Sequence, residues 1–140
     1  MNKIIIIEDD IAICNMIKKF LENNKYSVQY ALNGIEGIHL CKSFVPDLII
    51  LDIMLPGLNG DDVLQKLRKF TNAPVIVVSA KTMVQTKIEL LKMGADDYMT
   101  KPFDLYELLA RIEANLKRTV DNPYQNNNTL VYKDIKINNS

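Results

Sequence analysis

Five charged or polar side chains of this 140-residue chain stand at or just after the ends of short apolar runs: Glu8, Asp9, Asp52, Ser79 and Lys101. Asp52 closes an apolar run over residues 48–51, and Pro56-Gly57 breaks the chain soon after it. An aspartate at the end of one buried strand could simply cap a loop. Its chemistry therefore depends on whether the other four side chains lie beside it.

The three carboxylates would repel one another if they met. At ~4 Å and an effective dielectric constant of ~20, each pair costs roughly 4 kcal/mol. Either one carboxylate holds a proton with a raised pKa, or a hard divalent cation neutralises the cluster. A ligand set of oxygen atoms alone favours Mg²⁺ or Mn²⁺ over zinc.

Lys101 and Ser79 would add a positive charge and a hydroxyl donor, and both suit phosphate oxygens. A carboxylate beside a metal, a lysine and a hydroxyl is a phosphoryl acceptor, so Asp52 would attack phosphorus and become an aspartyl phosphate. A purely structural alternative stays open for each member. Glu8 and Asp9 could cap the next helix, Ser79 could be a turn residue, and Lys101 could be solvated surface.

Apolar patterning predicts strands and helices in strict alternation. Buried strands are expected at residues 3–7, 26–31, 48–52, 74–78 and 97–99. Helices are expected at residues 11–23, 35–44, 60–70, 82–93 and from 105 onward. Gly94 is expected to end the fourth helix and Asp104 to cap the fifth. Five strand–helix units of this kind predict an α/β fold with a doubly wound, five-stranded parallel sheet. In such a sheet all carboxyl ends of the strands share one edge, which would bring the five polar side chains together.

Composition sets the outer limits. The length predicts one domain with a sizeable core and an extra tail, and the formal net charge of zero advertises no nucleic-acid or membrane surface. Cys14 and Cys41 lie in helical patterns among apolar neighbours, so small core residues are expected rather than a disulfide or metal pair. No apolar run approaches membrane-spanning length and no signal peptide is visible, which predicts a cytoplasmic protein without a membrane partner.

Four motifs closely resemble the receiver domain of bacterial two-component response regulators. They are IIIIEDD at residues 4–10, LDIMLPGLNG at 51–60, VSAK at 78–81 and DYMTKPF at 97–103. The similarity extends over residues 2–118, and the combination of motifs is highly specific. It implies a flavodoxin-like receiver fold and a sensor histidine kinase as the phosphoryl donor.

The resemblance also implies a role for each matching residue. Glu8, Asp9, Asp52 and the backbone carbonyl of Met54 would bind Mg²⁺. Asp52 would be the phosphoacceptor, and Ser79, Ala80 and Lys101 would bind its phosphoryl group. Ser79 and Tyr98 match the family's switch pair, in which the hydroxyl turns to the phosphate and the aromatic ring follows it inward. The Lys101-Pro102 bond matches one that is cis in the family.

Residues 94–103 and the helix after them are similar to the OmpR/PhoB group of winged-helix transcription factors. That likeness implies a homodimer through the fourth helix, fifth strand and fifth helix. Charged pairs between subunits would join Lys87 to Glu107, Asp97 to Arg111 and Asp96 to Arg118, around an apolar centre of Ile88, Leu91 and Ala110. The alternative to pairs between subunits is that these charges form a solvated helical face or pair within one subunit. Lys92 departs from the group, where a carboxylate is common at this position.

The chain changes character after the receiver-like region, which we place at residues 1–118. Residues 119–128 are polar and rich in asparagine, which predicts a linker. Within residues 129–140 the pattern alternates, and it resembles the first strands of a winged-helix domain that is truncated here. We therefore expect promoter DNA to be a partner only of the full-length protein, because no recognition helix is present.

Two other classes of α/β protein are alternatives to a receiver domain. Phosphatases that pass through an aspartyl phosphate carry an Asp-x-Asp motif, in which the second carboxylate acts as general acid and base. Here that position is Met54, so at most slow self-dephosphorylation is expected rather than an enzyme. A flavodoxin-like cofactor binder would need a hydroxyl- and glycine-rich loop after the first strand, where Glu8 and Asp9 would repel a phosphate. A degenerate receiver that dimerises without phosphorylation would lack site residues that are all present here.

Overall fold

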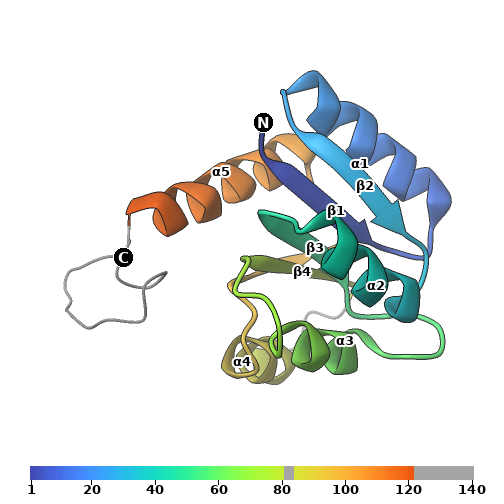
Figure 1. Cartoon of the computed structure of the whole chain (residues 1–140). Helices are drawn as coiled ribbons and strands as arrows, with labels where there is room; N and C mark the ends of the chain where they lie inside the picture. Colours follow the sequence, from blue (N-terminus) through green and yellow to red (C-terminus); the bar gives the residue numbers. More distant parts are fainter. Residues whose placement is uncertain (81–83, 122–140) are drawn as a thin grey trace.

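A computed structural model describes the backbone of residues 1–80 and 84–121, and the side chains of residues 1–80 and 87–118. Within these residues strands and helices alternate along the chain, as Figure 1 shows. The strands are β1 (Lys3–Ile7), β2 (Ser27–Ala31), β3 (Leu48–Asp52), β4 (Val75–Ser79) and β5 (Asp97–Thr100). The helices are α1 (Ile11–Asn23), α2 (Gly34–Phe44), α3 (Gly60–Leu67), α4 (Val84–Lys92) and α5 (Leu105–Asp121).

The five strands form one sheet in the order β2-β1-β3-β4-β5, and every pairing is parallel. This confirms the predicted doubly wound sheet. The strand order reverses between β1 and β3, because β2 lies on one side of β1 and the later strands lie on the other. Open α/β sheets bind their ligands beside the carboxyl ends of the strands at such a reversal.

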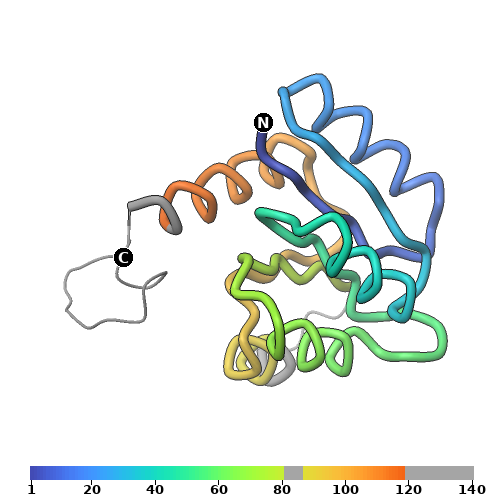
Figure 2. Tube along the Cα trace, viewed as in Figure 1, coloured from blue at the N-terminus to red at the C-terminus, as the bar shows by residue number. Residues whose placement is uncertain are grey.

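Helices cover both faces of the sheet (Figure 2). Successive side chains of a strand point to opposite faces, and in β1 Ile4 and Ile6 join one core while Ile5 and Ile7 join the other. The first core lies under α1 and α5, and the second lies under α2, α3 and α4. Burial of both faces explains why the inner strands β1, β3 and β4 read as continuous apolar runs, whereas β2 at the edge of the sheet is partly exposed.

Most expected boundaries agree with the structure to within two residues. The exception is the end of α3, which was predicted at residue 70 and lies at Leu67. Beyond it the Lys69 and Phe70 amides bond to the carbonyls of Lys66 and Leu67, three residues back, so the chain tightens into a turn. One bond of α-helical spacing follows, from the Thr71 amide to the Leu67 carbonyl, so the apolar periodicity continues through Phe70 although the regular helix has ended.

The helix ends follow their sequence signals in part. The Asp104 carboxylate accepts the Tyr106 amide at 2.7 Å, and Gly94 has a φ of +113° just after α4, which confirms both predicted caps. At α1 the cap is Asp10, which accepts the Ala12 and Ile13 amides. The two carboxylates before it, Glu8 and Asp9, are therefore not needed to cap that helix.

Several expectations lie partly or wholly outside the described residues. The predicted first residue of the fourth helix, residue 82, and Lys81 fall in residues 81–83. The predicted winged-helix strands fall in residues 129–140. α5 continues to Asp121, three residues into the stretch predicted as a linker. Among the described helices, none combines the length and the apolar character needed to cross a membrane. Cys14 and Cys41 are buried and unpaired, as expected.

Gly60 allows the start of α3 to lie against the end of β3. A Cβ atom at this position would meet the Ile53 Cα and would stand 2.7 Å from the Asp52 carbonyl oxygen. Both neighbours are backbone atoms, which cannot move aside as a flexible side chain would. The absence of a side chain at Gly60 thus helps to place Asp52.

We predict that Gly60→Ala lowers the free energy of unfolding by about 1–3 kcal/mol, because overpacking here displaces backbone. Asn59→Ala is the matched control, since Asn59 is exposed and its side chain makes no capping hydrogen bond. The control should change stability by no more than about 0.5 kcal/mol. Urea unfolding would measure both variants, and equal stability of the two would contradict this account of Gly60.

Candidate functional site

The site stands at the carboxyl edge of the sheet, where β1 and β3 end side by side. The register of the parallel pair places Ile7 beside Leu51, so the next residues along the two strands are Glu8 and Asp52. Both carry their side chains on the same face, because each continues the alternation of its strand. Their exposed fractions are only 4% each. Two carboxylates are therefore buried as neighbours across the strand pair.

Lys101 joins these two carboxylates. Its Nζ lies 2.7 Å from Glu8 Oε1 and 3.1 Å from Asp52 Oδ2. Its backbone amide donates to the Ser79 carbonyl at 2.8 Å, which ties the end of β5 to the end of β4. The Lys101-Pro102 peptide bond is cis, as the family resemblance implied. The sheet thus brings together residues 93 and 49 positions apart in the chain.

The remaining oxygen of each carboxylate accepts a backbone amide. Glu8 Oε2 accepts the Asp10 N–H at 3.1 Å, and Asp52 Oδ1 accepts the Met54 N–H at 2.9 Å. Each carboxylate is therefore oriented by one backbone donor and one shared ammonium group. The sequence indicated the lysine but not these amides, because they depend on how the chain turns after each strand.

Burial is the largest influence on the protonation of Glu8. It raises the pKa of Glu8 to about 7, opposed by the hydrogen bond from Lys101 and reinforced by the nearby Asp52 carboxylate. Burial would lower the pKa of Lys101, but its hydrogen bonds to Glu8 and Asp52 outweigh that effect and raise it. The lysine therefore stays charged while Glu8 is able to carry a proton near neutral pH.

The donor set fits a hard divalent cation. Carboxylate oxygens of Glu8, Asp9 and Asp52 lie within 4.8 Å of one another, and Asp9 is exposed at the mouth of the site. All these donors are oxygens, the ligands that Mg²⁺ prefers. The cluster is thus able to hold a metal. The predicted contribution of the Met54 carbonyl stays a prediction.

The predicted switch residues occupy different depths. Ser79 is fully buried at the end of β4, whereas Ala80 after it is exposed. Tyr98 on β5 is 6% exposed and packs in the core under α2, α3 and α4, so its ring already lies inward in this structure. Their roles as phosphate ligand and switch partner stay predictions.

The sequence profile of the family described as response regulator receiver domain matches residues 4–113, most of the chain. The chain belongs to the response regulator receiver family. Its sheet and its helices are thus those of a receiver domain of a two-component response regulator.

Three relatives illustrate the match. The receiver domain is 46% identical over 122 residues to the DNA-binding dual master transcriptional regulator RpaA of Synechocystis sp., covering 85% of this chain but 51% of that protein. Two solved structures resemble it throughout. The receiver domain of the Francisella response regulator 1452 is 40% identical with a TM-score of 0.81, and covers 85% of this chain and 99% of that one. The BeF3-activated N-terminal receiver domain of Klebsiella pneumoniae RstA is 32% identical with a TM-score of 0.78, at 82% and 98% coverage.

The residues expected at a dimer face divide into two groups in this receiver domain. Those exposed on α4 and α5 are Lys87, Ile88, Leu91, Glu107 and Ala110. The others make bonds within the chain. Arg111 bonds to Asp97 at 2.6 Å and to Glu107 at 3.1 Å, so the alternative of pairing within one subunit describes this structure. Arg118, which is exposed, donates to Asn115 at 3.0 Å.

Asp96 belongs to an arrangement that sequence reasoning missed. Arg68, just after α3, bonds to its carboxylate at 2.8 Å and also donates to the carbonyls of Gly94, Thr71 and Ala73. The same Asp96 oxygen accepts the Val75 amide at 2.9 Å. Arg68 lies 28 residues from Asp96, and no periodicity or motif marks such a contact.

The raised pKa of Glu8 yields a pH-dependent prediction. Between its ordinary value of 4.5 and about 7, the folded chain binds the Glu8 proton more tightly than the unfolded chain, so the Glu8 contribution to stability falls as pH rises through this window. Glu8→Gln cannot ionise. The free energy of unfolding of Glu8→Gln, relative to that of wild type, should therefore rise by up to about 3 kcal/mol from the low-pH end of this window to the high-pH end.

Urea unfolding from pH 4.5 to pH 8, in buffer with a chelator, would measure this difference. Asp9→Asn is the control, because that carboxylate is exposed and its removal should leave the profile close to that of wild type. A gap between Glu8→Gln and wild type that stayed constant over the window would contradict the assignment.

Proposed function

We propose that this receiver domain is a phosphorylation switch in which Asp52 accepts a phosphoryl group from a sensor histidine kinase. The observation that carries the proposal is the position of Asp52. It is a buried carboxylate at the end of β3, with one oxygen fixed by the Met54 amide and the other 3.1 Å from Lys101. An oriented carboxylate with an adjacent cation is suited to nucleophilic attack on phosphorus.

In the proposed reaction an Asp52 oxygen forms a bond to phosphorus while the N–P bond of the kinase phosphohistidine breaks. The electron pair of that bond leaves with the imidazole, and the product is an aspartyl phosphate. Lys101 would then pair with a phosphoryl oxygen, and the Ser79 hydroxyl would donate to another. Glu8, Asp9 and Asp52 would hold Mg²⁺, with the Met54 carbonyl as a further ligand, and the bound ion would supply charge neutralisation for the transferred group.

The same site would release the phosphoryl group slowly. A phosphatase of the Asp-x-Asp kind needs a carboxylate two residues after the acceptor, and this chain has Met54 there, with its side chain 54% exposed. With no acid or base at that position, we expect the aspartyl phosphate to persist as a signal, not to turn over as in an enzyme. Such a switch would act in the cytoplasm beside its kinase.

We infer that phosphorylation shifts the population of two conformations by about 1–3 kcal/mol, the usual range for coupling between sites. The favoured conformation would have the Ser79 hydroxyl on the phosphate and the Tyr98 ring inward. The buried Tyr98 supports this direction of change, because the inward position of its ring is accessible to this chain. That conformation would favour a homodimer through α4, β5 and α5.

The dimer face is supported by exposed apolar and charged groups on α4. Ile88 and Leu91 are each 41% exposed, although both are large and apolar. Lys87 forms no ion pair within the described residues, so it is available to a Glu107 of a second subunit. Asp96 and Asp97 already bond to Arg68 and Arg111 within the chain. To pair with Arg118 and Arg111 of a second subunit, they would have to keep or exchange these bonds.

Control of transcription is proposed by analogy. RpaA is described as a DNA-binding transcriptional regulator, and this chain spans about half of its length. Residues 119–128 would then be a linker, and residues 129–140 would begin a winged-helix domain of the OmpR/PhoB type. Promoter DNA would be bound only by a protein that carries the whole of that domain.

The phosphoacceptor assignment predicts a single mass change. Incubation with a small phosphodonor and Mg²⁺ should add one phosphoryl group, visible by intact-mass spectrometry, because Asp52 is proposed as the single acceptor beside Lys101 and the metal cluster. Asp52→Asn should show no adduct, while Asp47→Asn, which changes an exposed aspartate at the other end of β3, should label as wild type does. An adduct on Asp52→Asn equal to that of wild type would refute the assignment.

The dimer face predicts a charge-swap rescue. Lys87→Glu and Glu107→Lys should each weaken phosphorylation-dependent association by about threefold to tenfold, since each leaves like charges opposed across the interface. The double variant restores opposite charges and should regain most of the association in sedimentation velocity runs. Thermal unfolding of each protein would control for the loss of the Glu107–Arg111 bond. Single variants that associate as wild type, or a double variant that remains weak, would count against the pair.

A further inference from the structure

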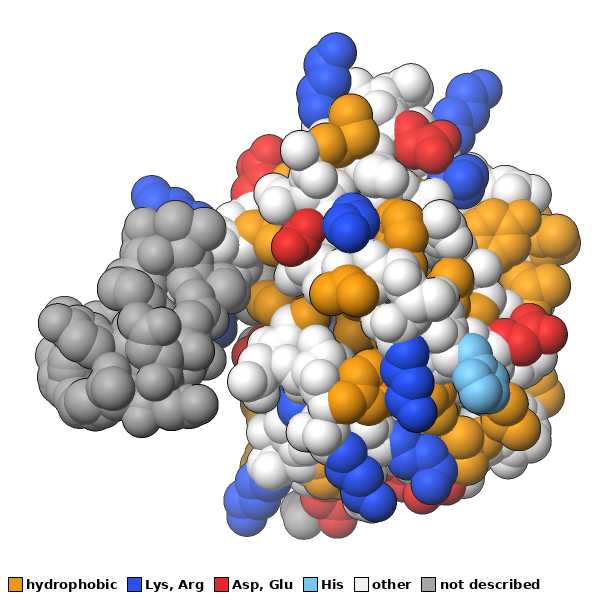
Figure 3. Space-filling view, viewed as in Figure 1, with side chains coloured by type: hydrophobic (Ala, Val, Ile, Leu, Met, Phe, Trp, Pro, Cys, Tyr) orange, Lys and Arg blue, Asp and Glu red, His pale blue; other side chains and the backbone are white. Residues whose placement is uncertain are grey.

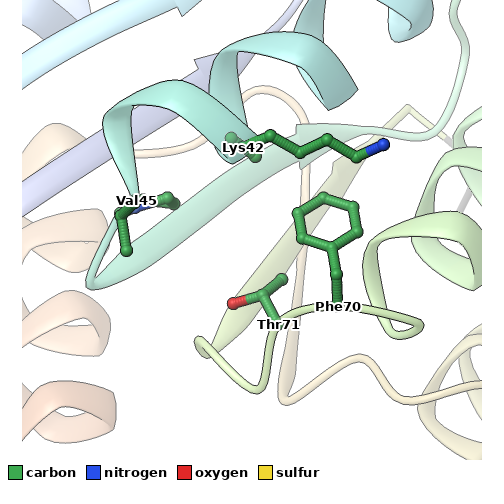
Figure 4. A pocket seen from close by; sticks show the side chains of 6 residues that line it. Lys42, Val45, Phe70 and Thr71 are labelled. Atoms are coloured by element: carbon green, nitrogen blue, oxygen red, sulfur yellow. The ribbon is translucent and has the colours of Figure 1, made fainter.

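A small pocket opens at the edge of the sheet opposite Asp52, where α2 ends and the chain enters β3 and β4. Figure 4 shows it, lined by Cys41, Lys42, Val45, Pro46, Phe70 and Thr71. Pro46 precedes β3, whereas Asp52 ends that strand, so the two sites are about 15 Å apart along β3 at ~3.3 Å per residue. The pocket is therefore separate from the proposed phosphorylation site.

Its volume indicates what it would hold. The pocket measures about 240 Å³. Small-molecule and cofactor sites typically enclose roughly 300–1,000 Å³, so this space suits one apolar side chain better than a whole cofactor. Hydrophobic groups of Val45 and Phe70 stand on opposite sides of the opening in Figure 4.

Phe70 has an exposed aromatic ring, and the ammonium group of Lys42 already lies over it. The ring is 39% exposed, and Lys42 Nζ lies 5.3 Å from its centroid. In Figure 4 the Lys42 side chain extends across the pocket toward the ring. This contact keeps the ammonium group at the mouth of the pocket while the ring remains an apolar wall.

Val45 has an unfavourable backbone conformation for its side chain. It caps the C-terminus of α2 with a φ of +50°, in the left-handed region where glycine is favoured and β-branched residues are rare. Its side chain is 64% exposed, so little burial within the chain offsets this strain. A strained, solvent-facing valine at the rim of a pocket points to a contact outside the chain.

The surroundings of the pocket are basic. Lys66 is exposed in the last turn of α3, and Lys69 is exposed in the turn that follows it, next to Phe70 in the chain. Within the described residues, none of Lys42, Lys66 and Lys69 forms an ion pair. Figure 3 shows Lys and Arg side chains gathered on the lower part of this face, with hydrophobic groups between them. We call the lining residues together with Lys66 and Lys69 the basic pocket.

We propose that the basic pocket is a docking site for an acidic peptide segment of a partner protein. One apolar side chain of the segment would insert between Val45 and Phe70, and its carboxylates would lie over Lys42, Lys66 and Lys69. The apolar cavity favours a peptide over a nucleic acid, because phosphate binding requires no such cavity. Base stacking is also disfavoured, since Lys42 already covers Phe70.

A titration with a designed peptide tests the proposal. The probe is a short peptide of Asp and Glu around a single central Leu, followed by ¹⁵N NMR of the whole chain. Amide shifts should cluster at the basic pocket, and binding should weaken with added salt. Replacing Asp and Glu by Asn and Gln, or the Leu by Ala, should each abolish or strongly reduce the shifts.

Three variants separate docking from general electrostatics and from folding. Lys42→Glu should weaken peptide binding about tenfold, as expected for reversal of a charge at an interface. Lys19→Glu is the matched control, because Lys19 is exposed on α1, which covers the other face of the sheet, and binding should be unchanged. Val45→Gly should weaken binding while leaving the thermal midpoint unchanged or higher, since glycine relieves the left-handed strain.

Four results would overturn the proposal. The first two are equal weakening by Lys19→Glu and Lys42→Glu, and shifts that persist with the Asn/Gln peptide. The third is a short DNA duplex that displaces the peptide and shifts the same amides more strongly, which would make this a nucleic-acid surface. The fourth is a set of pocket shifts that depends on protein concentration without peptide, which would identify a second copy of the chain as the occupant.

Discussion

Two buried carboxylates on neighbouring strands, held by one lysine, are the constraint on which this receiver domain depends. Glu8 and Asp52 are each 4% exposed, and Lys101 bonds to both. Removing one partner of a buried charge pair leaves the others uncompensated, which commonly costs 3–5 kcal/mol, about half of the stability of a small domain. Because one lysine is shared by two carboxylates, it would be readily redirected to a phosphoryl group in the proposed reaction.

The architecture creates this arrangement and also confines it. Burial of both sheet faces places strands β1 and β3 in the middle of the core, so side chains at their ends are desolvated although they stand at an edge. The strand order reverses between the same two strands, and open α/β sheets bind their ligands beside the strand ends at such a reversal. Gly60 and the amides of Asp10 and Met54 then determine the orientation of each carboxylate. Position comes from the sheet, and orientation comes from the loops.

That division explains what the sequence could predict. β-Branched runs ending in charged residues identify buried parallel strands and their carboxyl edge, so the doubly wound fold and the meeting of Glu8, Asp52 and Lys101 follow from pattern alone. Arg68 does not follow, because its five hydrogen bonds join segments whose proximity is known only once α3, β4 and β5 are packed. Sequence reasoning offered Glu8 and Asp9 as possible caps of α1 and missed Asp10, because only the turn after β1 selects it. Val45 gave no signal either, because its φ is set by how α2 meets β3.

The two edges of the sheet differ in how they hold charge, and this difference bears on function. At the carboxyl edge the acidic groups are buried and compensated within the chain, so a change there alters the balance of the fold itself. At the amino edge Lys42, Lys66 and Lys69 are exposed and form no ion pairs within the described residues. Exposed charges of this kind add little to stability, so they are free to serve recognition without a structural cost. In the proposed function, the carboxyl edge would respond to phosphorylation while the amino edge, at the other end of the same strands, would offer a separate surface for recognition.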